Sequence, residues 1–272
     1  MMRCSPYSFL GQAPIIGVVM QRLIFRCLMA AGGLGWALAF VPVPVAAQDA
    51  LDFETMRARM VTLVRYHASL VNAEIGLDPP DDRILAAMGR VERHAFVPEA
   101  FAPLAYLDTP LPVGHDQNIA QPYIVALMTQ LAAVRPGDRV FETGTGAGYH
   151  AALLSALGAR VYSVEIVAEL AERAAVTLAR LGYDDVEIRV ADGYDGWPEA
   201  GPYDVMLIKE SIVAVPPALL AQLKPGGRMV APIGPADGQQ FLTVLEKDGK
   251  GRVTRRKVLA VRFSPFQGGQ RT

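Results

Sequence analysis

Residues 141–150 read Phe-Glu-Thr-Gly-Thr-Gly-Ala-Gly-Tyr-His, so the acidic residue Glu142 stands two positions before three alternating glycines, Gly144, Gly146 and Gly148. An apolar, strand-like segment precedes this run, and an apolar helical pattern follows it. Glycine adopts positive φ without steric cost and lets backbone N–H groups approach a ligand closely. The N-terminus of the following helix adds a partial positive charge. The segment therefore predicts a strand, a tight loop and a helix start that bind a nucleotide-like ligand.

Two common nucleotide-binding loops fit this spacing poorly. The dinucleotide fingerprint needs its third glycine one position later, where this chain has Tyr149, and the P-loop needs a Lys-Ser/Thr pair that this loop lacks. The spacing Glu142-x-Gly-x-Gly-x-Gly148 instead resembles motif I of class I S-adenosylmethionine-dependent methyltransferases. That resemblance implies S-adenosyl-L-methionine as the cofactor, with the three glycines, Glu142 and Thr145 around it. The alternative is a turn that only packs a helix onto a sheet.

Two further acidic residues end the next two predicted strands. Glu165 follows the glycine turn by about twenty residues, the distance at which a carboxylate accepts both hydroxyls of a ribose. Asp192, followed by Gly193, ends the third strand and is placed to accept from an adenine amino group. An acidic residue at a strand end is often only a helix cap. Their joint occurrence, in this order, favours a cofactor site.

The second half of the chain alternates short apolar runs with helical patterns. Strands separated by helices of about ten residues predict a doubly wound, mostly parallel sheet, with ligands beyond the carboxyl ends of its strands. The fold class is therefore α/β, a Rossmann-like methyltransferase sheet with an N-terminal helical cap. The expected strands cover residues 139–141, 160–165, 186–191, 203–209, 228–233, 241–246 and 258–263, and the expected helices cover 151–157, 167–181 and 216–223.

The cap is predicted from two helical patterns before the sheet. Residues 51–76 repeat apolar side chains every three or four positions, and residues 83–91 follow a cap at Asp81 or Asp82. Residues 111–123 predict a polar loop that lies against a ligand, followed by a helix over 124–134. The expected domains are therefore a cap with substrate loop over 48–135 and a cofactor-binding core over 136–272.

The first 47 residues predict a secretory signal peptide. Arginines after Met20 form a positive region, an apolar run extends to Val45, and Ala47 ends a small-residue cleavage site. Met20 is a candidate start, and an uncleaved anchor or a buried core segment are the alternatives. Cleavage predicts a periplasmic or secreted protein with no stable membrane span; otherwise the protein is cytoplasmic or membrane-anchored.

Composition excludes several kinds of site. The formal net charge is -1, which is atypical of general nucleic-acid binders, so no nucleic-acid partner is expected. The two cysteines, Cys4 and Cys27, lie in the leader, which excludes a disulfide or a cysteine nucleophile from the globular part. The four histidines show no metal-ligand spacing, so no metal is expected. A monomer is the expected state.

Several segments together resemble one methyltransferase family, the protein-L-isoaspartate O-methyltransferases. The likeness covers about residues 55–265, in order. It rests on Phe96-Val-Pro-Glu99, Ala105-Tyr106, Gln121-Pro-Tyr-Ile-Val-Ala-Leu-Met128, Pro136-Gly-Asp-Arg-Val140, Gly144-Thr-Gly-Ala-Gly-Tyr149, Gly193-Tyr-Asp-Gly-Trp-Pro198 and Leu223-Lys-Pro-Gly-Gly-Arg228.

The resemblance implies methylation of the free carboxylate of L-isoaspartyl residues in damaged proteins or peptides, which begins their repair through a succinimide. A carboxylate has a pKa near ~4 and is already an anion at neutral pH, so no general base is needed. Catalysis is then mainly in-line positioning and desolvation.

The chain departs from the family where the substrate should lie. The family has Thr-Ile-Ser before the Gln-Pro pair, whereas this chain has Asn118-Ile-Ala120, so that Asn118 and Ala120 stand at the expected catalytic positions and Gln121 at a substrate position. Two lost hydroxyls are two lost donors to a carboxylate, each worth roughly 1.5–3 kcal/mol. Lys209 and Ser211, after the fourth strand, are candidates to bind the substrate carboxylate instead. A diverged methyltransferase with another acceptor, or a non-catalytic ligand-binding relative in the envelope, are the alternatives.

Overall fold

The computed structural model describes residues 52–268, and every structural statement below refers to that range. The predicted leader, with Met20 and both cysteines, lies outside the described residues. Within the described range, no helix has the length and apolarity needed to cross a membrane.

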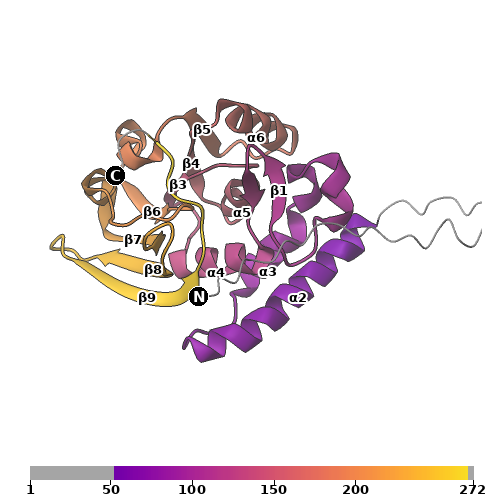
Figure 1. Ribbon diagram of the computed structural model, residues 1–272, viewed down its shortest axis with the longest axis horizontal. Helices are drawn as coiled ribbons and strands as arrows, with labels where there is room; N and C mark the ends of the chain where they lie inside the picture. Colours follow the sequence, from indigo (N-terminus) through magenta and orange to yellow (C-terminus); the bar gives the residue numbers. More distant parts are fainter. Residues whose placement is uncertain (1–51, 269–272) are drawn as a thin grey trace, which may run out of the picture. The chain divides into compact units, whose positions relative to one another are not determined.

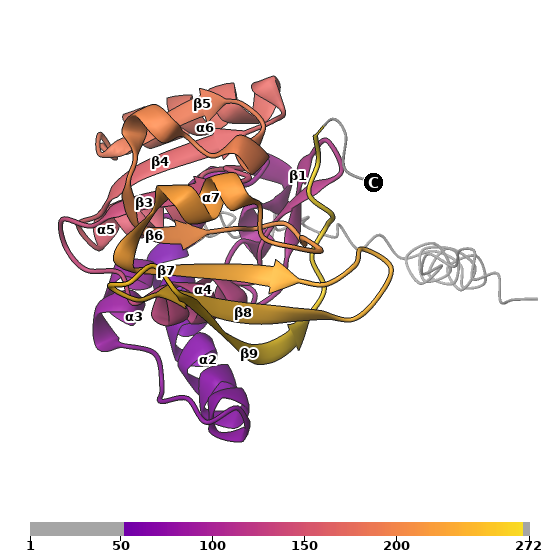
Figure 2. The same cartoon turned by 90° about the vertical axis from the view of Figure 1, so that its left-hand side faces the viewer.

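One sheet of seven strands forms the centre of the fold. Its order is β5-β4-β3-β6-β7-β8-β9, parallel from β5 to β7 and antiparallel from β7 to β9. Figure 2 shows the strands stacked in this order from β5 to β9. The strands are β3 (Arg139–Thr143), β4 (Arg160–Glu165), β5 (Val186–Val190), β6 (Tyr203–Leu207), β7 (Leu223–Ile233), β8 (Gln240–Lys247) and β9 (Val253–Val261).

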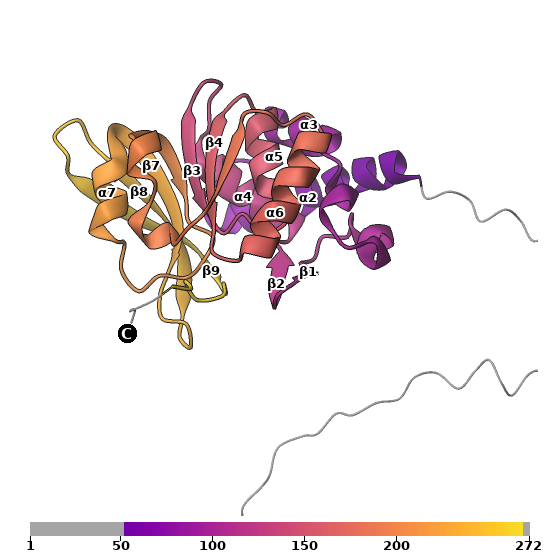
Figure 3. The same ribbon diagram turned by 90° about the horizontal axis from the view of Figure 1, so that it is seen from above.

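Alternating apolar side chains bury both faces of the parallel strands. In β3, Val140 belongs to one buried cluster and Phe141 to the other, and in β4 Val161 and Tyr162 divide in the same way. Successive side chains of a strand point to opposite faces, so both positions of each pair must be apolar. Helices α4 (Pro122–Ala132), α5 (Tyr149–Ala156) and α6 (Ala168–Arg180) lie on one face, and α7 (Pro217–Gln222) on the other (Figure 3).

The predicted cap is present and shares the core of the first face. It consists of α2 (Phe53–Glu74) and α3 (Asp82–Arg90), followed by two short 3-10 helices, η1 (Arg93–Phe96) and η2 (Glu99–Leu104). Met60, Val64 and Ala68 recur every four residues, so they lie along one stripe of α2 and are buried with α4 (Figure 1). Asp81 is the cap of α3, since its side chain accepts from the N–H of Arg83 at 2.8 Å.

The loop expected over residues 111–123 contains a hairpin instead. Strands β1 (Leu111–Gly114) and β2 (Gln117–Ile119) pair antiparallel across a turn at His115 and Asp116, whose φ angles are 53° and 55°. Left-handed turn residues such as these fit a tight hairpin, because their twist matches that of the strands.

Two strands, β7 and β9, begin five residues earlier than expected. Strand β7, expected from residue 228, begins at Leu223, and it pairs with β6 there and again from Arg228 after a shift of register. Strand β9 begins at Val253, five residues earlier than expected, because it pairs with β8 as far as Lys247. Antiparallel pairing lets the ladder extend to the turn itself, where the Asp248 side chain accepts from two backbone N–H groups.

Candidate active site

A cavity of about 440 Å³ opens at the carboxyl ends of β3, β4 and β6. It is walled by three parts of the chain that are distant in sequence: residues 117–121 at the start of α4, the glycine loop 143–150, and residues 259–267 at the end of β9. This is the edge at which parallel α/β sheets bind ligands. The sheet therefore places the predicted cofactor loop and the predicted acceptor loop around one space.

The glycine loop has the conformation that its composition predicts. Gly144, Gly146 and Gly148 have φ angles of 60°, 55° and 92°, in the region that favours glycine. A Cβ on Gly148 would also lie 3.2 Å from Leu178 Cδ1 and 3.3 Å from the Cβ of Ala174, both on α6. The loop therefore needs Gly148 for its backbone angle and for the close packing of α6.

Glu165 lies at the cavity wall and holds the glycine loop in place. Its Oε2 accepts from the N–H of Gly146 at 2.7 Å, and its Oε1 accepts from the N–H of Val167 at 3.0 Å. Each carboxylate oxygen has a second lone pair. The side chain is thus oriented by the backbone on both sides and keeps acceptor capacity for the hydroxyls of a ligand.

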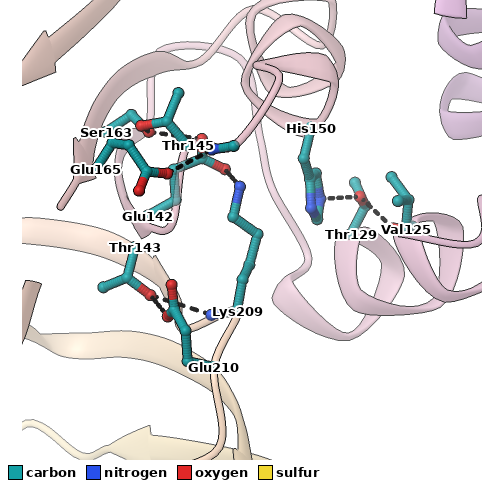
Figure 4. A network of polar contacts seen from close by, with 11 residues as sticks. Val125, Thr129, Glu142, Thr143, Thr145, His150, Ser163, Glu165, Lys209 and Glu210 are labelled. Carbon is teal, nitrogen blue, oxygen red and sulfur yellow. Dashed lines mark hydrogen bonds and ion pairs between the residues drawn. The ribbon is translucent and has the colours of Figure 1, made fainter. Parts of the chain in front are cut away.

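Glu142 lies beneath the loop rather than at the cavity (Figure 4). It is fully buried, and its Oε2 pairs with Nζ of Lys209 at 2.9 Å while its Oε1 accepts from the hydroxyl of Ser163 at 2.8 Å. The Ser163 and Thr145 hydroxyl oxygens are 2.5 Å apart. Glu142 therefore ties the loop to β4 and neutralises Lys209, one of the residues predicted to bind the substrate.

Glu210 is a cavity residue that sequence reasoning did not place in the site. Its Oε2 accepts from the hydroxyl of Thr143 at 2.5 Å, and the same hydroxyl oxygen accepts from the N–H of Lys209 at 3.1 Å. Burial raises the pKa of Glu210 to about 7, against the opposing effect of the Thr143 hydrogen bond. The only sequence signal was a charged pair at the end of an apolar strand.

The acceptor loop is held by its backbone and by the start of α4. Asn118, Ala120 and Gln121 all line the cavity, as expected. The Gln121 amide donates to Oδ2 of Asp108 at 3.2 Å. Asp108 also accepts from the N–H of Tyr123 at 2.8 Å. The same carboxylate therefore caps α4 and orients the side chain of Gln121.

A buried arginine fixes the same loop from below. The guanidinium of Arg93 donates to the carbonyl oxygens of Ala105 at 2.8 Å and Ala120 at 2.9 Å, and it lies 4.8 Å from the ring centre of Tyr149. Burial lowers the pKa of Arg93 to about 10. No sequence pattern predicts that Arg93 supports this loop, because its partners are backbone carbonyl groups, which every residue carries.

Some of the remaining predicted site residues line the cavity, and others do not. Gly193 lines the cavity, and a Cβ there would lie 2.7 Å from Cγ2 of Thr143. Asp192 accepts from the N–H of Tyr194 at 3.0 Å and is not among the lining residues. Ser211 is buried outside the cavity, and its backbone pairs with that of Ser264 and Phe266 at 2.8 and 3.1 Å, which fastens the tail of β9 across the sheet.

Among residues 52–268, no group of three or more His, Cys, Asp or Glu side chains is arranged to hold a metal ion. The polar lining of the site includes the carboxylates Glu165 and Glu210, the ammonium of Lys209, which is paired with Glu142 outside the cavity, the amides of Asn118 and Gln121, and the backbone of the glycine loop. This arrangement provides hydrogen-bond acceptors and oriented N–H groups, which suits binding and positioning of a polar ligand.

The chain was compared with known proteins. Protein-L-isoaspartate O-methyltransferase 1 of Cupriavidus necator is 46% identical over 256 residues, which are 94% of this chain and 96% of that protein. A solved protein-L-isoaspartate O-methyltransferase is 28% identical, with a TM-score of 0.68 over 78% of this chain and 66% of that chain.

A second solved structure supports the fold alone. It is described as a putative protein-L-isoaspartate O-methyltransferase from Plasmodium falciparum in complex with S-adenosyl-L-homocysteine; it is 21% identical, with a TM-score of 0.65 over 78% of this chain and 98% of that chain.

A family model settles the membership of the chain. The model described as protein-L-isoaspartate(D-aspartate) O-methyltransferase (PCMT) matches residues 68–271, which contain the glycine loop, the acceptor loop and all seven strands of the sheet. The chain belongs to the protein-L-isoaspartate O-methyltransferase family, whose members are S-adenosylmethionine-dependent methyltransferases.

Proposed function

We propose that this protein transfers a methyl group from S-adenosyl-L-methionine to the free carboxylate of L-isoaspartyl residues in damaged proteins. Membership of the family supports the activity. The observation that carries it in the structure is the Gly146–Glu165 hydrogen bond of 2.7 Å, which holds the glycine loop open toward the cavity that also contains Asn118, Ala120 and Gln121. Cofactor loop and acceptor loop thus face one space.

The residues present fit the cofactor. The left-handed glycines carry no side chains of their own toward the cavity that they line, and Glu165 has acceptor capacity there. We assign the ribose hydroxyls of the cofactor to Glu165 and its adenosyl end to Gly193 and the adjoining backbone. The backbone of residues 144–148 lies against the rest of the cofactor. When bound, S-adenosyl-L-methionine supplies an activated methyl group on a sulfonium.

The acceptor side needs little from side chains. A substrate carboxylate with a pKa near ~4 is ionised at neutral pH, so no residue has to remove a proton. The Asn118 amide can donate a hydrogen bond to it, while Arg93 and Asp108 keep the backbone at Ala120 and the side chain of Gln121 in fixed positions. The protein's contribution is positioning and exclusion of water from the cavity.

Methyl transfer can be measured directly on the chain beginning at Gln48. With radiolabelled S-adenosyl-L-methionine, we expect label in a peptide that contains one L-isoaspartyl residue and none in the same peptide with a normal aspartyl residue. Cofactor binding seen by calorimetry together with no label in either peptide would contradict the isoaspartyl assignment.

A second candidate, methyl transfer to a different acceptor, is favoured by one observation. The cavity presents the methyl group of Ala120 and the amide of Asn118 where the family has hydroxyl groups. A cofactor-dependent transfer to other carboxylates, with the isoaspartyl peptide unlabelled, would favour this candidate. Ligand binding with no transfer to any acceptor would favour a non-catalytic relative.

We also propose that the protein is exported, with a signal peptide cut after Ala47. The charged and apolar regions and the small residues before the cut support this proposal. Cell fractionation and sequencing of the mature N-terminus would test it, and a cytoplasmic protein that begins at or before Met20 would contradict it. We propose further that the protein acts as a monomer, which light scattering would check.

A further inference from the structure

The carboxyl group of Glu210 lies directly on the glycine loop. A Cβ placed on Gly144 would overlap Oε1 of Glu210, so the carboxyl oxygen occupies the space that the absent side chain of Gly144 leaves. The other oxygen is fixed by the Thr143 hydroxyl at 2.5 Å. Figure 4 shows Glu210 beside Thr143 and the backbone of Lys209. Any ligand that lies against the loop at Gly144 must therefore contact Glu210.

The cation nearest to Glu210 is already paired. Lys209, the next residue in sequence, directs its ammonium to Glu142 at 2.9 Å, and its side chain is 14% exposed. His150 on α5 is buried against Thr129 at 2.9 Å, and burial, followed by the charge of Lys209, holds the pKa of His150 well below its usual value. Neither group supplies an unpaired positive charge to Glu210.

The charge around the loop is therefore negative when the carboxyl groups are ionised. Three carboxyl groups, of Glu142, Glu165 and Glu210, stand against one ammonium, that of Lys209. Burial is the main cause of the raised pKa of Glu210; the charge of Lys209 lowers this pKa, and the charges of Glu165 and Glu142 raise it further. One further cation among the lining residues is the exposed Arg262, which follows β9. Such a surplus favours a ligand that brings positive charge to this end of the loop.

We propose that Glu210 recognises positive charge at the methionyl end of the cofactor, so that it determines affinity for the charged form of the ligand. This proposal rests on the proposed function, because it requires the cavity to take S-adenosyl-L-methionine. The ligand offers two cationic groups, the sulfonium and the α-ammonium, and the experiment below distinguishes them. Recognition of a cation by Glu210 needs the ionised form of its carboxyl group, since only the carboxylate carries a negative charge.

The proposal predicts a proton coupled to binding. With its pKa raised to about 7 by burial, Glu210 is largely protonated at pH 6 and largely ionised at pH 8. A bound cation favours the ionised form, so binding at pH 6 releases about one proton and binding at pH 8 releases almost none. A residue that serves only to pack the loop would release none at either pH.

Calorimetric titration in buffers of different ionisation enthalpy measures that proton. We expect S-adenosyl-L-methionine to release about one proton from the wild-type protein at pH 6, and none from Glu210→Gln, which keeps the shape and loses the charge. At pH 8 the same variant should bind the ligand at least about tenfold more weakly than wild type, as expected for a lost hydrogen bond or ion pair to a charged group. Glu187→Gln, on the exposed edge of β5, is the matched control and should behave as wild type.

Two related ligands assign the charge. S-adenosyl-L-homocysteine keeps the α-ammonium and lacks the sulfonium, and methylthioadenosine lacks both. Proton release with S-adenosyl-L-methionine and S-adenosyl-L-homocysteine, but not with methylthioadenosine, assigns Glu210 to the ammonium. Proton release with S-adenosyl-L-methionine alone assigns it to the sulfonium. Equal affinity and equal proton release in wild type and Glu210→Gln would overturn the inference and leave the proposed function untouched. Proton-linked binding without methyl transfer would overturn the proposed function alone.

Discussion

Nζ of Lys209 lies 2.9 Å from Oε2 of Glu142, and the Glu142 side chain is completely buried. The two residues are 67 positions apart in sequence and come from β3 and from the segment after β6. A second contact of Glu142, in which its other oxygen accepts from the hydroxyl of Ser163, extends the pair to β4. One ion pair therefore joins three neighbouring strands directly below the glycine loop.

Removal of the ammonium should strongly destabilise the fold. Lys209→Met leaves a buried, unpaired carboxylate, and we expect a loss of about 3–5 kcal/mol in the free energy of unfolding, measured with urea at pH 8. Addition of Glu142→Gln should recover part of that loss, since no charge then stays buried. Arg65→Met, which breaks an exposed pair with Asp82, is the control and should change stability far less. Equal effects at the two sites would contradict this account.

Stability should depend on the titration of Glu210. Because its pKa is raised from 4.5 to about 7 in the folded protein, the folded state binds more protons than the unfolded state between these values. This contribution to stability is full below pH 4.5 and is lost as the pH rises through about 7. The difference in unfolding free energy between wild type and Glu210→Gln should therefore fall across this window. A difference that is independent of pH would show that the carboxyl group titrates normally.

Gly148→Ala should damage both the fold and the loop. The variant meets a φ of 92° and two side chains of α6 at 3.2 and 3.3 Å, so we expect a loss of about 2–4 kcal/mol and weaker cofactor binding. Gly182→Ala has a φ of 77° and open space around it, so it carries the backbone strain alone, about 1–2 kcal/mol. Thermal unfolding and cofactor titration would separate the two effects. Equal losses would show that contact with α6 is unimportant.

Ala120→Ser should raise methyl transfer to an isoaspartyl peptide. The new hydroxyl would add a donor to the substrate carboxylate, and we expect kcat/KM to rise about tenfold. The gain should appear in the peptide kinetics and not in the affinity for the cofactor. Ala191→Ser, also at the cavity, is the control. An unchanged rate would show that the missing hydroxyl does not limit this enzyme.

Arg93→Met should affect the acceptor side more than the cofactor side. The variant removes both donors to the carbonyl groups of Ala105 and Ala120, so the acceptor loop loses its support from below. We expect kcat/KM for the peptide to fall about tenfold or more, with cofactor affinity changed by less than about threefold. Arg90→Met, whose guanidinium bonds the Ala156 carbonyl at the surface, is the control. A larger loss in cofactor affinity than in peptide kinetics would contradict a role at the acceptor loop.

Local pattern was sufficient to predict most of the fold. The strand of residues 160–165 was predicted to the residue, because buried parallel strands consist of short apolar runs between polar ends. The glycine loop was equally visible, since its backbone angles require glycine. The hairpin at residues 111–119 was missed because its strands are three and four residues long, and β1 contains Pro112.

The pairing of charges was beyond sequence reasoning. Glu142 and Lys209 are each plausible ligand residues alone, and only the parallel pairing of β3 with β6 brings them together below the loop. Glu210 and Arg93 were missed for a related reason. Glu210 lies against the Cα of Gly144, and Arg93 donates to two backbone carbonyl groups. Partners of this kind cannot be recognised from the sequence of side chains.

The cavity wall formed by residues 259–267 has a thermodynamic consequence. Those residues meet residues 117–121 and the glycine loop only when β9 has paired with β8 and the tail has paired with Ser211. A chain in which β9 has not paired lacks this wall, so a ligand of the cavity should bind it more weakly than the complete fold. Free ligand at 100 times its Kd then adds about 2.7 kcal/mol to the stability of the whole unit. Cofactor binding therefore favours the completely folded form of the described chain.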